Sequence, residues 1–200
     1  MATIKASRLA AVNTIISNVG QSPLNNLDSG NPLAELAEGI LDEITRAVQA
    51  EGWSFNTEYG YPATPDATTK EVAVRSNMLS VDLSPTHKKQ VVIRGGKLYD
   101  KVNHTATFTE DSLELDIVWL VDFEDMPEAY KNYVTIRAAN VFAGRTVGTQ
   151  EAVKFGEREE LMARANCIEY ETQQGDYTVF SNRDNEMTYN GYRPIDALWR

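Results

Sequence analysis

The sequence predicts an α+β fold: a mainly α-helical bundle of about four helices, with an inserted antiparallel β-rich subdomain and an extended C-terminal arm. Three observations predict it. Apolar residues recur at three- and four-residue steps in four segments near the two ends of the chain. Short β-rich runs with turn signals occupy the middle. Residues 173–200 carry Gly, Asn, Asp and Pro punctuation without a sustained period.

Two helices are expected in the N-terminal part. The first spans Leu9 to Val19, and Gly20 followed by Pro23 is the expected stop. Asn31 can cap a second helix with Pro32 at its first position. This helix runs to Gly52 with the apolar stripe Leu33, Leu36, Ala37, Ile40, Leu41, Ile44 and Val48.

From Trp53 the pattern changes to short β-rich runs. WSFNTEY, MLSVDL and QVVIRGGKLYD are the first of them, and Gly95-Gly96 in the last run indicates a hairpin with a primed turn. The segment from Leu113 to Val121 alternates apolar and polar residues and is expected to be the last strand.

Two further helices follow. Asp125 and Glu128 have the spacing of a capping box, with Pro127 in the first turn, and this helix is expected to run to about Val147 with Gly148 as its C-terminal cap. The fourth helix covers roughly Glu151 to Glu171. Its apolar side is expected to be Phe155, Leu161, Met162, Ala165 and Ile168.

These elements predict a helical bundle of residues 1–52 and 122–172, a β-rich insert of residues 53–121, and an extended C-terminal arm of residues 173–200. A chain of 200 residues is long enough for one domain with a substantial insertion and too short for two large independent domains.

Charge and cysteine content exclude several classes of protein. The 29 acidic and 19 basic residues give a net charge of -10, which argues against a surface that holds nucleic acid through its phosphates. The single cysteine, Cys167, cannot form an intrachain disulfide and is expected to be a buried small hydrophobe. The N-terminus has no signal-peptide pattern and no apolar run approaches a membrane span, so we expect a protein made in the cytosol.

Motifs for catalysis or cofactor binding are missing from the sequence. The two histidines, His87 and His104, have no metal-ligand spacing around them. No phosphate-binding loop and no G-x-S-x-G nucleophile motif occurs. We therefore expect no cofactor, no metal and no enzymatic activity.

Carboxylates are the one catalytic group in excess. Eight lie between Glu110 and Glu128 with no Lys or Arg among them, and a pair of acids could serve glycoside hydrolysis. The alternative is a solvated surface, because Glu114 and Asp116 alternate with apolar residues of a strand and Asp125 can cap a helix.

A basic block directly precedes this acidic run. Between His87 and Lys101 the only acid is Asp100, while the cations include four candidate interface residues, Lys88, Lys89, Arg94 and Lys97. Opposite blocks can pair within a sheet or across a subunit boundary. Our hypothesis is that this basic hairpin faces acidic surface of a neighbouring subunit.

Several stretches, taken in their order, resemble the tail tubular protein A family of podoviruses, the head-to-tail adaptors or gatekeepers of short-tailed phages. They are AVNTIISNVGQSPLNNL (Ala11–Leu27), GWSFN (Gly52–Asn56), RGGKLYD (Arg94–Asp100), DMPE (Asp125–Glu128), RAANVFAGR (Arg137–Arg145) and ARANCIEYE at the end of the fourth helix. The resemblance covers about Ala11 to Glu171, and the chain after Gln173 is not matched.

The resemblance implies a structural protein of the phage tail, made in the host cytoplasm. It implies a homo-oligomeric ring of about twelve copies. The implied partners are the portal protein, the tail nozzle protein (tail tubular protein B) and tail fibres attached near the rim. DNA would pass through the ring without specific binding, and no membrane is involved.

The third helix supplies candidates for the interface between subunits or with a partner. Aromatic residues and Arg are enriched in interface cores, and this helix carries Tyr130, Tyr133, Arg137, Phe142 and Arg145. The alternative is that the aromatic residues fill the core of the subunit itself. The C-terminal arm adds Tyr177, Phe180, Tyr189, Tyr192 and Trp199, which either dock on another surface or pack on the same subunit.

The fourth helix supplies candidates for an acidic lumen that repels the DNA backbone: Glu157, Glu159, Glu160, Glu169 and Glu171. We also expect a subunit that is monomeric until it meets the portal, where the aromatic arm becomes ordered. Two other classes of function stay open. One is a tail-associated hydrolase that acts on cell-surface glycan through paired carboxylates, and the other is a non-viral helical regulatory module.

Overall fold

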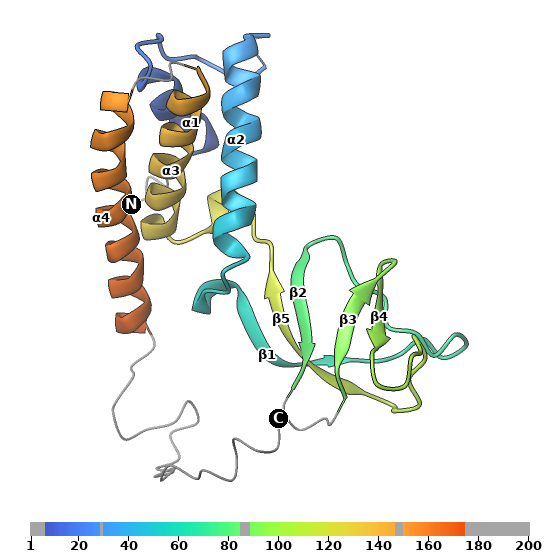
Figure 1. Ribbon diagram of the computed structural model, residues 1–200. Coiled ribbons are helices and arrows are strands. Elements are labelled where there is room, and N and C mark those ends of the chain that lie inside the picture. The colour runs from blue at the N-terminus through green and yellow to red at the C-terminus, as the bar shows by residue number, and fades with distance from the viewer. Residues whose placement is uncertain (1–6, 29, 85–88, 147–149, 175–200) are drawn as a thin grey trace, which may run out of the picture.

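The computed structural model describes residues 7–28, 30–84, 89–146 and 150–174. In these residues four α-helices form a bundle and five strands form a separate β part beside one end of it (Figure 1). The helices are α1 (Arg8–Ser17), α2 (Pro32–Gln49), α3 (Glu128–Thr146) and α4 (Gln150–Gln174). The strands are β1 (Thr57–Ala63), β2 (Met78–Leu83), β3 (Val91–Arg94), β4 (Lys97–Asp100) and β5 (Leu113–Trp119). The predicted α+β class is confirmed.

The first two helices begin and end close to the predicted positions. The Ser7 hydroxyl caps α1 by accepting from the N–H of Ala10 at 3.2 Å. The Asn31 side chain caps α2 by accepting from the N–H of Leu33 at 2.9 Å, and Pro32 is the first helical residue, as predicted. The chain leaves α2 through Gly52, whose φ of +76° favours glycine.

The start of α3 differs from the prediction. A short 3₁₀ turn, η2 (Phe123–Asp125), precedes the helix, so Asp125 lies two residues before Pro127 and three before Glu128 rather than at the cap. The Pro127 carbonyl accepts from the N–H groups of Tyr130 and Lys131, at 3.0 and 3.1 Å. The predicted capping box is therefore wrong, because the chain turns once before the helix begins. Residues 147–149, on which the predicted C-terminal cap falls, lie outside the described ranges.

The β part contains a three-stranded antiparallel sheet in the order β1-β5-β2 and the hairpin β3-β4. Gly95 and Gly96 join the hairpin strands with φ of +59° and +72°, as the predicted primed turn requires. The run WSFNTEY is only partly a strand: Ser54–Asn56 form a 3₁₀ turn (η1) and β1 begins at Thr57. The Asn56 side chain causes the turn, since its Oδ1 accepts from the N–H of Trp53 at 2.9 Å.

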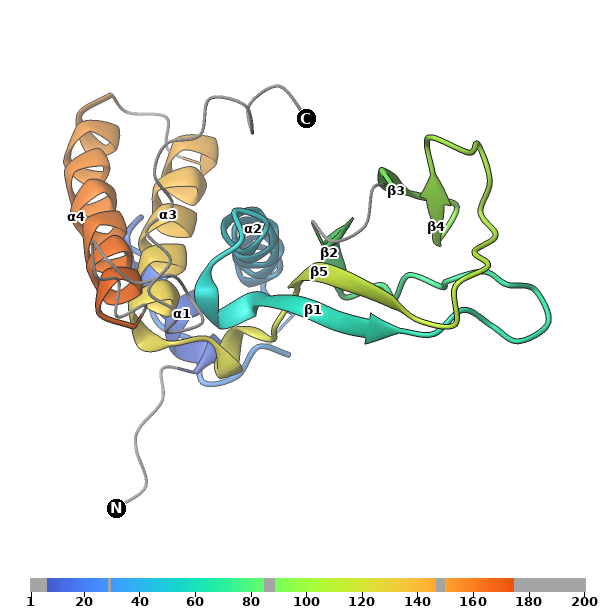
Figure 2. The ribbon, with the colours of Figure 1, turned by 90° about the horizontal axis from the view of Figure 1, so that it is seen from below.

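The two parts have separate hydrophobic cores. One core joins α1, α2 and α3 with Ala163 and Cys167 of α4, and the other is enclosed by the β-strands and the segments between them. Figure 2 shows the β part extending from the bundle on the side of α2, whereas α4 lies on the opposite side, beyond α3. None of the helices in the described ranges is long and apolar enough to cross a bilayer.

Candidate functional site

Helix α4 packs against α3 through small residues. Gly156, Ala163 and Cys167 are buried on the side of α4 that faces the bundle. Asn140 of α3 donates from Nδ2 to the Gly156 carbonyl at 2.9 Å, which is a close approach that a side chain on residue 156 would obstruct. Cys167 donates its thiol hydrogen to the Ala129 carbonyl at 3.3 Å, and burial raises the pKa of this thiol to about 11. Cys167 is buried, as the sequence predicts.

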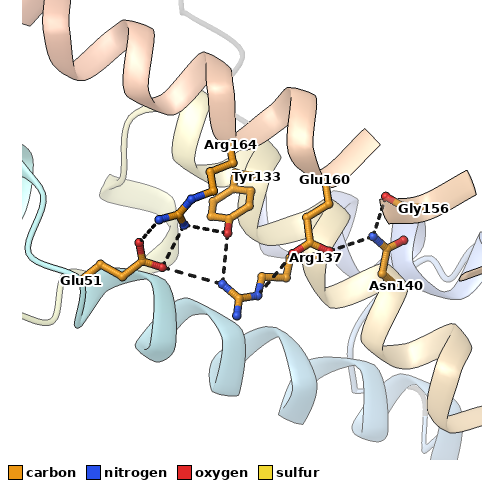
Figure 3. Close-up of polar contacts among 7 residues, drawn as sticks. All are labelled: Glu51, Tyr133, Arg137, Asn140, Gly156, Glu160 and Arg164. Atoms are coloured by element: carbon orange, nitrogen blue, oxygen red, sulfur yellow. Dashed lines mark hydrogen bonds and ion pairs between the residues drawn. The ribbon is translucent and has the colours of Figure 1, made fainter. Parts of the chain in front are cut away.

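A layer of charged residues joins α4 to α3 and to the end of α2 (Figure 3). We call it the polar layer; it consists of Glu51, Tyr133, Arg137, Glu160 and Arg164. Arg164 donates hydrogen bonds from both terminal nitrogens to the Glu51 carboxylate, at 3.1 and 2.7 Å. The Tyr133 hydroxyl oxygen accepts from Arg137 and from Arg164, at 3.1 Å each. Hydrogen bonds to Glu51 and Tyr133 raise the pKa of the Arg164 guanidinium.

The C-terminal part of α4 is tied to the turn after α2. The Glu171 carboxylate accepts from the hydroxyl of Tyr130 at 2.7 Å and from the N–H and hydroxyl of Ser54 at 2.8 and 3.0 Å. These contacts and the polar layer fix the rotation of α4 about its axis, and so decide which of its faces points outward.

The outward face of α4 is apolar. Leu161, Met162 and Ile168 are 69%, 61% and 52% exposed, and Ala165 between them is exposed as well. These four residues, here called the outer apolar face, belong to the predicted apolar side of the fourth helix; its fifth member is Phe155, whose side chain lies outside the described residues. They face outward because the smaller residues on the opposite side allow a closer approach to α3, and the polar layer holds that side inward (Figure 3).

The aromatic candidates of α3 lie inside the subunit. Tyr130, Tyr133 and Phe142 are almost completely buried. Tyr130 packs edge-to-face against Trp53 with ring centroids 5.0 Å apart. Their side chains are not available to a neighbour in this structure, so the expectation that they form an interface is corrected in favour of the alternative, a core within the subunit.

The two Arg candidates of α3 are partly exposed and already paired. Arg145 binds Glu43 of α2 with both terminal nitrogens, each at 2.9 Å. Arg137 lies 3.8 Å from Glu51 and 3.6 Å from Glu160 within the polar layer. The arm candidates Tyr177, Phe180, Tyr189, Tyr192 and Trp199 lie outside the described residues.

The basic hairpin candidates pair within the β part. Lys89 forms an ion pair with Glu110, and Lys97 forms one with Glu71 at 2.7 Å. The Arg94 guanidinium stacks over the Tyr99 ring, 4.1 Å from its centroid. These contacts favour pairing inside the subunit over the predicted contact with a neighbour, whereas Lys88 lies outside the described residues.

The acidic candidates on α4 divide into two groups. Glu160 accepts from Asn140 at 3.1 Å and Glu171 binds Tyr130 and Ser54, so both are engaged within the subunit. Glu157, Glu159 and Glu169 are exposed. Of the five candidates, these three have carboxylates that no other element of the described chain binds, so they can face a lumen or a partner.

Several contributing residues were not predicted from the sequence. Glu51, Ser54 and Asn140 complete the contacts that hold α4, but each lies where a surface polar residue is ordinary. The small residues Gly156, Ala163 and Cys167, at steps of seven and four, were the available signal for the packing face of α4. Among the residues that the structure describes, no cluster of three or more His, Cys, Asp or Glu could hold a metal ion.

Comparison with known proteins identifies the family. The family described as tail tubular protein matches residues 9–177 of the chain. The chain is also 33% identical to tail tubular protein A of Klebsiella phage KP34 over 121 residues, which cover 60% of this chain and 62% of that protein. The match thus spans a little less than two thirds of that relative. The chain belongs to the tail tubular protein family and is a structural component of a phage tail.

Proposed function

We propose that the chain is one subunit of a ring-shaped adaptor in the phage tail. The ring, of about twelve copies as the family resemblance implies, joins the portal to the tail nozzle protein, carries tail fibres near its rim and leaves a channel for DNA. Membership of the tail tubular protein family supports the structural role and the place in the tail. The exposed apolar residues of α4 support assembly through contacts between subunits.

The observation that carries this proposal is that α4 has apolar residues on two opposite sides. One side buries Ala163 and Cys167 against α3, and the other exposes Leu161, Met162 and Ile168. A helix that is apolar on both sides is characteristic of a helix buried on both sides. An exposed apolar patch of this kind marks an interaction site.

A tube that encloses DNA requires several copies of a chain of this size. A folded chain of 200 residues has a radius of gyration of about 16 Å, which is too small to enclose a DNA duplex by itself. Each copy in a ring needs two different complementary faces, because head-to-tail contacts close a ring by rotation. The outer apolar face supplies one of them.

The net charge of -10 fits a channel that does not hold DNA. Phosphates are repelled by acidic walls, and the salt-dependent attachment that cations would create is avoided. The exposed Glu157 and Glu159 are candidates for the lumen wall. In the same proposal the arm after Gln173 docks on the portal, and a chain truncated there should stay folded but lose portal binding.

The test is electron microscopy of the purified chain, alone and mixed with a portal protein, for the wild type and for the variant Leu161→Asp/Ile168→Asp. We expect closed rings with the wild type and none with the variant, because burial of two carboxylates without partners is unfavourable. Asn166→Asp adds a charge to an exposed position of α4 outside the apolar face and is the matched control. Rings formed equally well by the double variant, or no ring of the wild type even with the portal, would overturn the proposal.

The hydrolase alternative gains no support from the carboxylates. A general acid in glycoside hydrolysis needs a raised pKa. In the acidic run, the hydrogen bond from Lys89 lowers the pKa of the Glu110 carboxyl, and Asp116 accepts from the N–H of Gly60 at 3.0 Å. No contact among the described residues favours a catalytic pair over a structural surface.

A further inference from the structure

Two helices on opposite sides of the bundle carry exposed stripes with the same spacing. On α4 the stripe is Arg158, Met162, Ala165 and Glu169, and on α2 it is Glu35, Gly39, Asp42 and Arg46. In both stripes the residues follow at steps of four, three and four, which places them on one side of a helix. We call them the α4 stripe and the α2 stripe.

The charges of the two stripes are opposite at both ends. The α4 stripe begins with a cation and ends with an acid, whereas the α2 stripe begins with an acid and ends with a cation. The two charged positions are eleven residues apart in each stripe, or about 16 Å along a helix. Both helices run in the same direction, from the end of the bundle far from the β part toward it (Figure 1). Rotation about an axis roughly parallel to the helices would bring the α4 stripe of one copy against the α2 stripe of the next with matching charges.

The terminal charges are available for such a contact. In the described part of the chain, Glu35, Arg46 and Arg158 have no ion-pair partner, and Glu169 accepts only from Gln173 at 3.4 Å. Asp42, in the middle of the α2 stripe, is already bound by Arg8 through two hydrogen bonds of 2.7 Å. Its burial between copies would therefore not leave an unpaired carboxylate.

The shapes of the stripes match as well. Met162 projects from α4 at the position that corresponds to Gly39 on α2. Apart from its chain neighbours and the backbone of α2, no atom lies within 4 Å of where a Gly39 Cβ would be. A groove of about 380 Å³ lies alongside, lined by Gly39, Asp42, Arg46, Val121 and Phe123 among others. Methionine is a flexible side chain that fills such irregular space. We call the open space at Gly39 the notch. Leu36, three residues before Gly39, is 42% exposed and is the one large exposed apolar side chain of the described bundle outside α4.

We propose that the α4 stripe of each copy packs in parallel against the α2 stripe of the next copy of this chain. Arg158 then faces Glu35 of the next copy, Glu169 faces its Arg46, and Met162 enters the notch at its Gly39. The inference rests on the proposed ring and names the two surfaces that close it. The contact is head-to-tail, since the two surfaces differ.

Exchange of one charge pair tests the pairing. Arg158→Glu and Glu35→Arg each place like charges opposite one another, and each should weaken the contact between copies by about tenfold or more. The double variant R158E/E35R restores the opposite pair and should recover most of the loss. Association is measured by sedimentation velocity over a range of concentrations at low salt, with circular dichroism as the test of folding.

Disulfide cross-linking tests the same contact in assembled tails. A chain with Met162→Cys and Gly39→Cys should form a ladder of covalent oligomers longer than a dimer on mild oxidation, because every copy then offers both partners of the bond. The chain with Glu159→Cys and Gly39→Cys is the matched control, since residue 159 lies off the stripe, and it should give no ladder. The experiment is done with the purified chain and with phage particles that contain the variant.

The outcomes separate this inference from the proposed function. Recovery in R158E/E35R together with the ladder supports the pairing of stripes. Copies that associate, in solution or in particles, without recovery and without a ladder show that the ring stands and this pairing is wrong. Copies that contact one another in neither setting overturn both proposals.

Discussion

Gln49 and Val121 are joined by two hydrogen bonds at the point where the chain passes from the β part back into the bundle. The Gln49 side chain donates from Nε2 to the Val121 carbonyl at 2.8 Å and accepts at Oε1 from the Val121 N–H, also at 2.8 Å. Gln49 ends α2, and Val121 follows β5. The Gln49 amide therefore pairs with the Val121 backbone as a neighbouring strand would, at the place where the β part meets the bundle, here called the joint. Asn56 adds two bonds to the same joint, to the carbonyls of Gln49 and Trp119 at 2.9 and 2.7 Å.

Gln49→Leu should lower the free energy of unfolding by about 2 kcal/mol, because it removes the buried amide that pairs with the N–H and the carbonyl of the half-buried Val121. Urea denaturation followed by circular dichroism measures the loss. Gln174→Leu, at an exposed position near the end of α4, is the control and should change stability little. A loss of similar size in both variants would show that the Gln49 amide does not stabilise the joint.

The helices and the hairpin could be predicted because their signals are local. Asn31 with Pro32 marks the start of α2, and Gly95-Gly96 marks the turn between β3 and β4. The joint could not be predicted in this way. Gln49 and Val121 are 72 residues apart, and a single polar side chain near a helix end gives no sign of its partner.

The orientation of α4 could not be predicted from the sequence, and the reason is physical. The periodicity of the helix identifies Leu161 and Ile168 as one side, but periodicity does not say whether that side meets the same chain or another one. The inward side is decided by Gly156, which permits a close approach to α3, and by Arg164, which binds Glu51 just after the C-terminal end of α2. Such contacts depend on tertiary structure.

Arg164→Lys should lower the free energy of unfolding by about 1 kcal/mol. A lysine has one nitrogen, so it cannot bind both oxygens of the Glu51 carboxylate as the guanidinium does and also donate to the Tyr133 hydroxyl. The expected loss is small because Arg164 and Glu51 are partly exposed to solvent. Arg158→Lys on the same helix is the control and should have almost no effect on the monomer in thermal denaturation. Equal shifts in the melting temperature of the two variants would contradict the role given to the polar layer.

Tyr130 should make stability fall at high pH. Burial and then the hydrogen bond to Glu171 raise the pKa of its phenol above the ordinary value of about 10. Because the folded pKa is raised, the stability is fully present below the unfolded pKa and is lost as pH rises above it, where the unfolded chain releases the proton first.

Tyr130→Phe should remove this part of the pH dependence, and urea denaturation between pH 8 and about 11 measures it. A slope that is unchanged in Tyr130→Phe would mean that the buried phenol titrates as in the unfolded chain.

Two glycines should respond to alanine with opposite signs. A Cβ on Gly156 would lie 2.7 Å from Cγ of Asn140, whose side chain is held by hydrogen bonds to the Gly156 carbonyl and to Glu160 at 2.9 and 3.1 Å. Gly156→Ala must therefore break these bonds or move α4, and we expect a loss of stability of about 1–3 kcal/mol. Gly144 of α3 has open space around the same position, so Gly144→Ala should gain about 0.5–1 kcal/mol from the better helix former. Thermal denaturation of the two variants measures both changes, and a gain for Gly156→Ala would show that α4 does not approach α3 through this residue.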